Sequence, residues 1–119
     1  MRQENVRLKV SAEGRGTVVE LTDRKILDEV SIMQIGQQLQ ALVAKDAVPK
    51  LVLDFSNVGH MSSSALGVLI TLHKRVREKN GQLMLCNIQP AIHEVFVITR
   101  LNEIFQICRT KQEALDSLK

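Results

Sequence analysis

The sequence predicts an α/β fold with a mixed, mostly parallel sheet, an N-terminal β-hairpin and about four helices. Two apolar runs, Lys50–Phe55 and Gln82–Ile88, are short and nearly continuous, which is typical of strands buried on both faces of a parallel sheet. Segments with apolar residues at helical spacing lie between such runs, and this alternation predicts right-handed crossovers. At 119 residues the chain is expected to form one domain, residues 1–119.

The N-terminal segment is expected to form the hairpin. In NVRLKVSAEGRGTVVELT, polar residues separate Val6, Leu8 and Val10, and this alternation is typical of a half-buried strand. A glycine-bearing turn, Glu13–Gly16, then leads into a second apolar segment that ends at Leu21. We therefore expect two antiparallel strands that extend the sheet.

The segment Ser31–Ala44 has the period of a helix, with apolar residues on one face and glutamines on the other. Ser31 is the expected N-cap, because a serine hydroxyl can accept a free amide hydrogen of the first turn. Gly36 lies in the helix interior, where glycine costs about 1 kcal/mol relative to alanine. Its presence there indicates a close contact with a neighbouring element.

The second half of the chain alternates between the two kinds of element. A helix led by serines is expected to end at Asn80–Gly81, a typical C-terminal stop. Pro90 starts the next helix, Ile104–Ile107 is a third short strand, and Thr110–Glu113 has capping-box spacing. The apolar residues expected on the faces of the last two helices are Ile92, Val95, Phe96, Leu115 and Leu118.

Composition and charge argue against several classes of function. No run of about 18 apolar residues is present, and the N-terminus lacks the apolar centre of a signal peptide, so we expect a cytoplasmic protein without membrane insertion. The net charge is +3, and the densest basic run, His73–Lys79, fits the solvated end of a helix. With no Trp and no Tyr, the stacking surface typical of nucleic-acid binding is missing, and no direct nucleic-acid contact is expected.

Cysteine and histidine spacing gives no metal or redox motif. Cys86 and Cys108 are the two cysteines, and no CxxC occurs, so both are expected to be buried free thiols. His73 and His93 lack partners at metal-ligand spacing. We therefore expect no metal and no cofactor.

The stretch DFSNVGHMSSSALGVLI places three serines, Ser62, Ser63 and Ser64, at the start of an apolar helix. One serine is enough to cap a helix. The amide groups and the dipole of a helix N-terminus also favour a phosphate, and a phosphoserine carries about −1.5 to −2 charges at neutral pH. Two interpretations stay open from spacing alone: a cap with its first turn, or a phosphorylation site.

Enzymatic alternatives have less support. Asp54, His60 and Ser64 are the residue types of a hydrolase triad, but the chain has no G-x-S-x-G elbow and nothing that would turn Asp54 toward His60. No Walker A motif occurs either. We expect a protein that is not an enzyme and has no catalytic residues.

The region from Leu51 to Ile107 resembles the core of the STAS-domain family of anti-sigma factor antagonists. The shared order is a strand, a serine loop, a helix ending in NG, a strand, a helix led by proline and an L-x-x-I-F strand. The hairpin and the first helix fit more loosely, so the resemblance covers nearly the whole chain. The serine loop before A/G-L-G is its specific part, and it implies a single STAS-type domain.

The resemblance implies a binding protein switched by phosphorylation. Such proteins bind an anti-sigma factor that is also a serine kinase and so release a sigma factor to regulate transcription. The kinase modifies a serine at the start of the helix, and a PP2C-type phosphatase reverses this. Matching MSSSALG to the family motif D-S-S/T-G-L-G places Ser64 at the acceptor position, with Ser63 as the alternative. Ser62 and Ala65 stand where the family usually has Asp and Gly.

The partner is expected to cover the serine loop and the loops beside it. The predicted contact residues are Asp23, Asn57, His60, Met61, Ser62, Ser63 and Ser64. The same resemblance leaves an alternative, a STAS scaffold subunit of a larger signalling or lipid-transport complex that is never phosphorylated. The sequence sets no oligomeric state.

Overall fold

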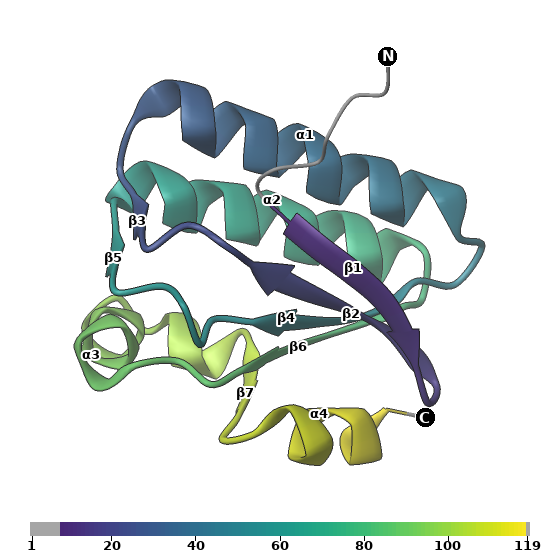
Figure 1. The fold of residues 1–119 in the computed structure, drawn as a ribbon. Coiled ribbons are helices and arrows are strands. Elements are labelled where there is room, and N and C mark those ends of the chain that lie inside the picture. Colours follow the sequence, from purple (N-terminus) through teal and green to yellow (C-terminus); the bar gives the residue numbers. More distant parts are fainter. Residues whose placement is uncertain (1–7, 119) are drawn as a thin grey trace.

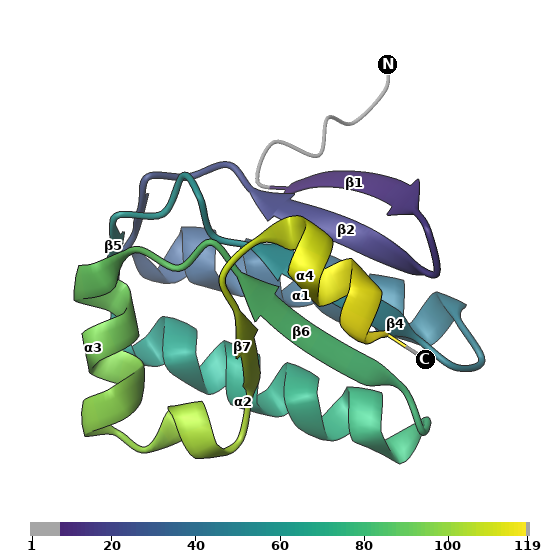
Figure 2. The same ribbon diagram turned by 90° about the horizontal axis from the view of Figure 1, so that it is seen from below.

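The computed structural model, which describes residues 8–118, places a five-stranded sheet between helices (Figure 1). The elements are β1 (Leu8–Glu13), β2 (Gly16–Leu21), β3 (Lys25–Ile26), α1 (Glu29–Lys45), β4 (Lys50–Asp54), β5 (His60–Met61), α2 (Ser63–Glu78), β6 (Gln82–Cys86), α3 (Pro90–Ile98), the 3-10 helix η1 (Leu101–Glu103), β7 (Gln106–Cys108) and α4 (Lys111–Ser117). The sheet order is β1-β2-β4-β6-β7. Helices α1 and α2 cover one face, α4 covers the other, and α3 lies at one end of the sheet (Figure 2).

The hairpin and the parallel sheet were both predicted, and both are confirmed. Strands β1 and β2 are antiparallel, whereas the β2–β4, β4–β6 and β6–β7 pairs are parallel. Leu51, Val52 and Leu53 of β4 are fully buried, as expected for a central strand covered on both faces. Val10 is 44% exposed because β1 is an edge strand. Val6 lies outside the described residues.

The predicted N-cap of the first helix is wrong. The cap is Asp28, whose backbone is extended (φ −90°, ψ 150°) and whose Oδ2 accepts a hydrogen bond from the Ser31 amide at 3.0 Å. Ser31 itself lies in the first turn and is buried. Asp28 suits this position because its negative charge interacts favourably with the positive end of the helix dipole.

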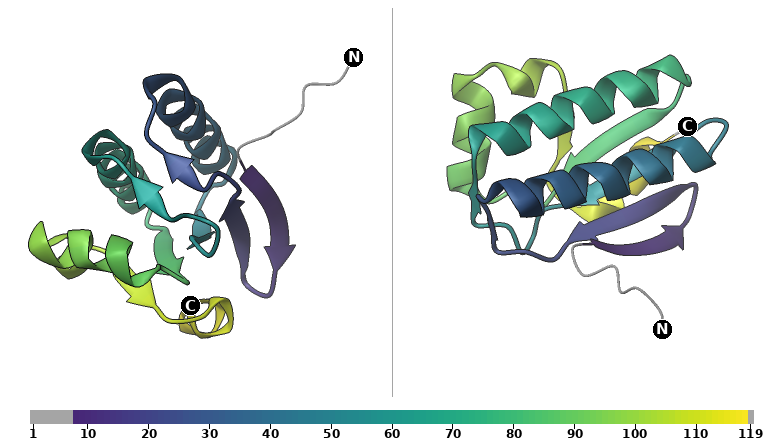
Figure 3. Two further views of the ribbon diagram at one scale, coloured as in Figure 1. Left: turned by 60° about the vertical axis from the view of Figure 1, so that its left-hand side comes forward. Right: turned by 90° about the horizontal axis from the view of Figure 1, so that it is seen from above.

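The close contact predicted at Gly36 is confirmed at the α1–α2 interface. A Cβ atom at this position would lie 3.3 Å from Val68 Cγ1 on α2, which is tighter than ordinary van der Waals contact. The glycine therefore allows the two helices to pack closely side by side, as the view from above shows (Figure 3).

Helix α2 ends as predicted at Asn80–Gly81. Asn80 has a positive φ of 59°, its amide donates to the Arg77 carbonyl, and the Gly81 amide donates to the Val76 carbonyl at 2.9 Å. These are the two hydrogen bonds of a Schellman motif. A side chain at Gly81 would collide with the carbonyl oxygen of Pro49, so this turn needs glycine at its second position.

The C-terminal part of the chain departs from the predicted boundaries. The third short strand begins at Gln106 instead of Ile104, because η1 and the turn after it occupy the residues before the strand. Val95, expected on the inner face of α3, is 37% exposed, whereas Ile92 and Phe96 are buried. The prediction that Val95 belongs to the buried face of α3 is therefore wrong, whereas those for Ile92 and Phe96 are confirmed.

The last helix is capped as predicted, with one difference. Thr110 Oγ1 accepts from the Glu113 amide at 3.1 Å, and the Glu113 carboxylate accepts from the Arg109 amide instead of from that of Thr110. Leu118 is buried but lies at the C-cap, just outside the helix. It packs with Ala114 in a small core beneath α4 that is separate from the main core.

Lys79 joins the C-terminal ends of the two long helices. Its Nζ donates to the carbonyl oxygens of Val43, Ala44 and Asp46 at 2.9, 3.2 and 2.7 Å. Carbonyl groups at a helix end lack partners within the helix, and a cation there also interacts favourably with the helix dipole.

We predict that Lys79→Met lowers the free energy of unfolding by about 1–2 kcal/mol, because the apolar stem remains and the charged hydrogen bonds are lost. Urea unfolding followed by circular dichroism measures the change. Lys74→Met, an exposed position on the same helix, is the matched control and should change little. Equal effects of the two substitutions would contradict the role assigned to Lys79.

His73 should make the fold sensitive to mild acid. Its ring packs edge-on against Phe105, with centroids 5.3 Å apart, and its Nδ1 is buried with no hydrogen-bond partner among residues 8–118. Burial, with a contribution from the charge of Arg77, lowers the pKa of His73 below its ordinary value. The unfolded chain therefore binds the proton more tightly than the folded chain does, and stability is lost as the pH falls through about 6.5.

We predict that the free energy of unfolding decreases between pH 7.5 and pH 5.5, and that His73→Leu reduces this decrease. Urea unfolding at the two pH values measures it, with His93→Gln, an exposed histidine, as the control. The same pH dependence in His73→Leu and in the unmodified protein would show that another group is responsible.

Candidate functional site

The three serines have different positions at the start of α2. Ser62 is the N-cap, with an extended backbone (φ −87°, ψ 167°), and its Oγ accepts from the Ala65 amide at 3.4 Å. Ser63 and Ser64 are the first two helical residues, and both are exposed. One hydroxyl therefore caps the helix, and two are open to solvent.

The serine loop, residues 56–62, is held by the segment that follows β2. The carbonyl oxygen of Arg24 accepts from the amides of Gly59 and His60 at 2.8 and 3.1 Å, and the carbonyl oxygen of Ile26 accepts from the Ser62 amide at 3.0 Å. These bonds accompany the parallel β3–β5 pair, seen beside the N-terminal ends of α1 and α2 in Figure 3. They place the segment that contains the half-buried Asp23 next to the serine loop.

Buried side chains fix the other end of the serine loop. Phe55 and Val58 are fully buried, and the Val58 amide donates to the Phe55 carbonyl at 2.9 Å. Asn57 between them is exposed, and its Nδ2 donates to Glu20 Oε2 at 2.7 Å. The loop is therefore tied to the core, to β2 and to β3, which suits a surface presented in one fixed shape to a partner.

A cleft of about 830 Å³ opens beside the serine loop. It lies where β2 and β4 end, and its lining includes Lys9, Glu20, Arg24, Lys25, Asn57 and His60. Sequence reasoning identified Asn57 and His60 but missed the three cations. Lys9 is placed at the cleft by the β1–β2 pairing, whereas Arg24 and Lys25 are brought to the loop by the β3–β5 pairing. No local sequence pattern could have indicated that the three cations meet.

An exposed apolar strip lies on the segment that leads from β3 into α1. Leu27, Val30 and Met33 are 50, 56 and 55% exposed. Their spacing of three residues continues from the end of β3 along the start of α1. The strip was not predicted, because residues at this spacing are usually taken as the buried face of a helix.

The residues of the rejected hydrolase triad do not come together. Asp54 Oδ1 accepts from the Ser56 amide and from Asn87 Nδ2 at 2.9 and 3.1 Å. Neither His60 nor Ser64 forms a hydrogen bond with it among residues 8–118. Within the same residues, no three His, Cys, Asp or Glu side chains are grouped so as to hold a metal ion.

The comparison with family models decides the family. The model of the STAS domain matches residues 9–114. The chain belongs to the STAS domain family. This STAS domain is 29% identical over 94 residues to BtrV of Bordetella bronchiseptica, which is named as an anti-sigma factor antagonist, with 79% of this chain and 80% of BtrV covered. It is 26% identical over 93 residues to the anti-sigma F factor antagonist of Paenibacillus polymyxa, covering 78% of this chain and 80% of the relative.

Solved structures share the fold of this STAS domain. An anti-sigma-factor antagonist domain protein from Planctomyces limnophilus matches with a TM-score of 0.82 and 27% identity, covering 92% of this chain and 96% of that one. SpoIIAA in its unphosphorylated form matches with a TM-score of 0.69 and 22% identity, covering 92 and 94%. The predicted fold class and the predicted family are thus confirmed. No helix in residues 8–118 is long and apolar enough to cross a membrane.

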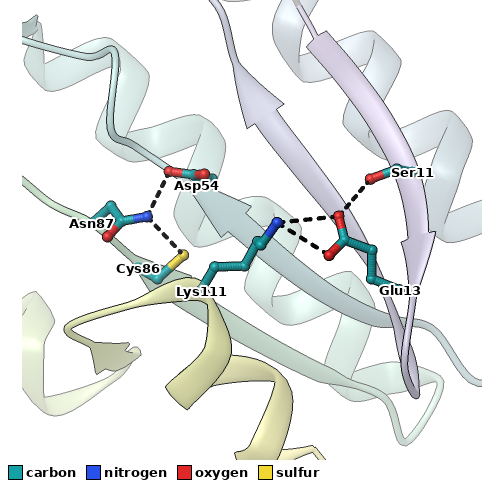
Figure 4. Close-up of polar contacts among 6 residues, drawn as sticks. All are labelled: Ser11, Glu13, Asp54, Cys86, Asn87 and Lys111. Carbon is teal, nitrogen blue, oxygen red and sulfur yellow. Dashed lines mark hydrogen bonds and ion pairs between the residues drawn. The ribbon is translucent and has the colours of Figure 1, made fainter.

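A second polar cluster lies away from the serine loop, where α4 begins (Figure 4). Lys111 forms an ion pair with Glu13 at 3.1 Å, and this pair, together with the Ser11 hydroxyl, lowers the pKa of Glu13. Next to it, Cys86 is opposite Cys108 in the β6–β7 register, and both are free thiols. Cys86 is buried as predicted, whereas Cys108 is half-buried.

Burial raises the pKa of Cys86 to about 12, and the charge of Asp54 adds to the effect. Because the thiolate is the reactive form, we predict that iodoacetamide at pH 8 labels Cys86 only on unfolding. Mass spectrometry of peptides from native and urea-unfolded protein measures this. Fast labelling of Cys86 in the native protein would show that the thiol is open to solvent.

Proposed function

We propose that the protein is an anti-sigma factor antagonist, a regulator without catalytic activity, whose binding to an anti-sigma factor serine kinase is switched by phosphorylation of Ser64. Unphosphorylated protein binds the kinase in the cytoplasm and releases a sigma factor, and a PP2C-type phosphatase restores this form. The observation that carries the proposal is that Ser64 is exposed in the first turn of α2, directly after a loop that is fixed by backbone hydrogen bonds.

The positions of the serines argue against Ser62 as the acceptor, and the family motif favours Ser64 over Ser63. The Ser62 hydroxyl is engaged as the helix cap, so modifying it would disturb the start of α2. Ser63 is exposed and is the alternative. Ser64 is favoured because it aligns with the modified hydroxyl residue in the family motif.

The charge of a phosphate at Ser64 should act on binding more than on folding. The helix dipole favours an anion at this end, by about 0.3–2 kcal/mol. SpoIIAA, a neighbour in fold, is known in a phosphorylated form that matches this chain with a TM-score of 0.70, close to the 0.69 of the unphosphorylated form. This similarity supports a switch that leaves the domain folded.

The proposed partner covers the serine loop and the segments tied to it. Its contacts are Asp23, Asn57, His60, Met61, Ser62, Ser63 and Ser64. A doubly charged phosphate within such an interface would either lose its hydration or be repelled by carboxylates of the partner, and both effects would weaken binding. A loss of about 3–4 kcal/mol would weaken binding several-hundred-fold, which is enough for a switch without any backbone movement.

A scaffold subunit that is never phosphorylated is the second candidate. Two observations favour it: Ser62 and Ala65 replace the usual Asp and Gly of the family motif, and the strip Leu27, Val30 and Met33 offers apolar contact area that needs no phosphate. Such a subunit would bind its partners equally well before and after kinase treatment.

We predict that Ser64→Ala binds the anti-sigma factor kinase as tightly as the unmodified protein, and that this affinity persists with ATP present. Ser64→Glu should bind at least about 100-fold more weakly, since it places a charge in the interface. Isothermal titration calorimetry measures both, with Thr71→Ala, which removes a hydroxyl from an exposed position further along α2, as the control. Binding by Ser64→Glu equal to that of the unmodified protein would favour the scaffold function.

A further inference from the structure

The cleft beside the serine loop is positively charged. Lys9, Arg24 and Lys25 line it and are exposed. Glu20 is the one carboxylate among its described lining residues. Glu20 is opposite Lys9 in the β1–β2 register, so its charge offsets mainly that of Lys9. Its Oε2 also accepts a hydrogen bond from the side-chain amide of Asn57. Within residues 8–118, the lining holds no second carboxylate to offset the charges of Arg24 and Lys25.

The two cations are held in place by the backbone that carries the serine loop. Arg24 and Lys25 belong to the segment whose backbone carbonyl groups accept hydrogen bonds from the amides of Gly59, His60 and Ser62. A partner that covers Ser64 would therefore meet these charges at a fixed distance along one continuous surface. Fixed complementary charges increase the association rate and the selectivity of an interface.

The lining of the cleft indicates the chemistry of its occupant. Pockets for small organic ligands are mostly apolar and aromatic. Here, Ser56, Asn57 and Gln89 contribute hydroxyl and amide groups, and within residues 8–118 the His60 ring is the one aromatic side chain in the lining. Amide and hydroxyl groups suit the main chain of an extended peptide, and the cations suit carboxylates.

We propose that this cleft receives an acidic segment, with two or more Asp or Glu side chains, of the protein that covers the serine loop. The identity of that protein rests on the proposed function, whereas the charge of its segment rests on the cleft alone. The cleft then supplies charge recognition at one end of the interface, and Ser64 supplies the switch at the other.

A peptide titration tests the cleft without the partner. Nitrogen-15 spectra of the full chain are recorded with hexaglutamate, with hexaglutamine and with inorganic pyrophosphate. Hexaglutamate should shift the amide signals of residues 22–25 and 57–60 with saturation, and hexaglutamine should not. The double variant Arg24→Gln/Lys25→Gln should bind hexaglutamate about tenfold more weakly, since two surface ion pairs are lost.

The matched control is Lys74→Gln/Arg75→Gln, which removes the same charge from an exposed face of α2 and should bind like the unmodified protein. An equal loss in the control would mean nonspecific attraction and would overturn the proposal. So would equal shifts with hexaglutamine, or tighter binding of pyrophosphate, which would identify a site for small anions.

A titration of the anti-sigma factor kinase then separates the two proposals. Arg24→Gln/Lys25→Gln should weaken its binding about tenfold at low salt, and the difference should shrink at about 0.5 M salt because exposed charges are screened. If Ser64→Glu abolishes binding but the cleft variant binds normally, the proposal for the cleft fails alone. If Ser64→Glu has no effect while hexaglutamate binds as expected, the proposed switch fails and the cleft stands.

Discussion

Three backbone hydrogen bonds between the segment after β2 and the serine loop organise the functional end of this protein. They run from the amides of Gly59, His60 and Ser62 to the carbonyls of Arg24 and Ile26. The loop has other attachments, through Phe55, Val58 and the Asn57–Glu20 hydrogen bond, but these three bonds are the ones that connect it to the segment that carries Arg24 and Lys25. The short β3–β5 pair thus turns separate loops into one surface.

The helices and the sheet give that surface a rigid base. Gly36 allows α1 and α2 to pack closely, and Lys79 joins their far ends through three carbonyl oxygens. Both helices have their N-terminal ends at the end of the sheet where β3 and β5 lie (Figure 1). In the proposed switch, a charge added in the first turn of α2 is therefore held on a rigid surface, so that a modest electrostatic energy would be sufficient to change the affinity for the partner.

Much of the fold could be predicted from the sequence because its signals are local. Three signals each extend over only a few residues: the alternation at the hairpin, the apolar run of the strand Lys50–Asp54 and the stop at Asn80–Gly81. The serine loop was found by its motif. The N-cap of α1 was misplaced at Ser31 because aspartate and serine are both good capping residues, and the sequence does not show that the helix begins three residues earlier, after Asp28. The cleft could not be predicted, since a strand pair of two residues has no period and its cations meet only in three dimensions.

The central claim is that the Ser64 hydroxyl is the acceptor that a kinase partner modifies. Phosphosite mapping by tandem mass spectrometry, after incubation of the protein with its anti-sigma factor kinase and ATP, tests this most directly. The account predicts a single phosphate on Ser64, with Ser62 and Ser63 unmodified. A phosphate on either of those serines with Ser64 intact, or no phosphate on a protein that still binds the kinase tightly, would contradict it.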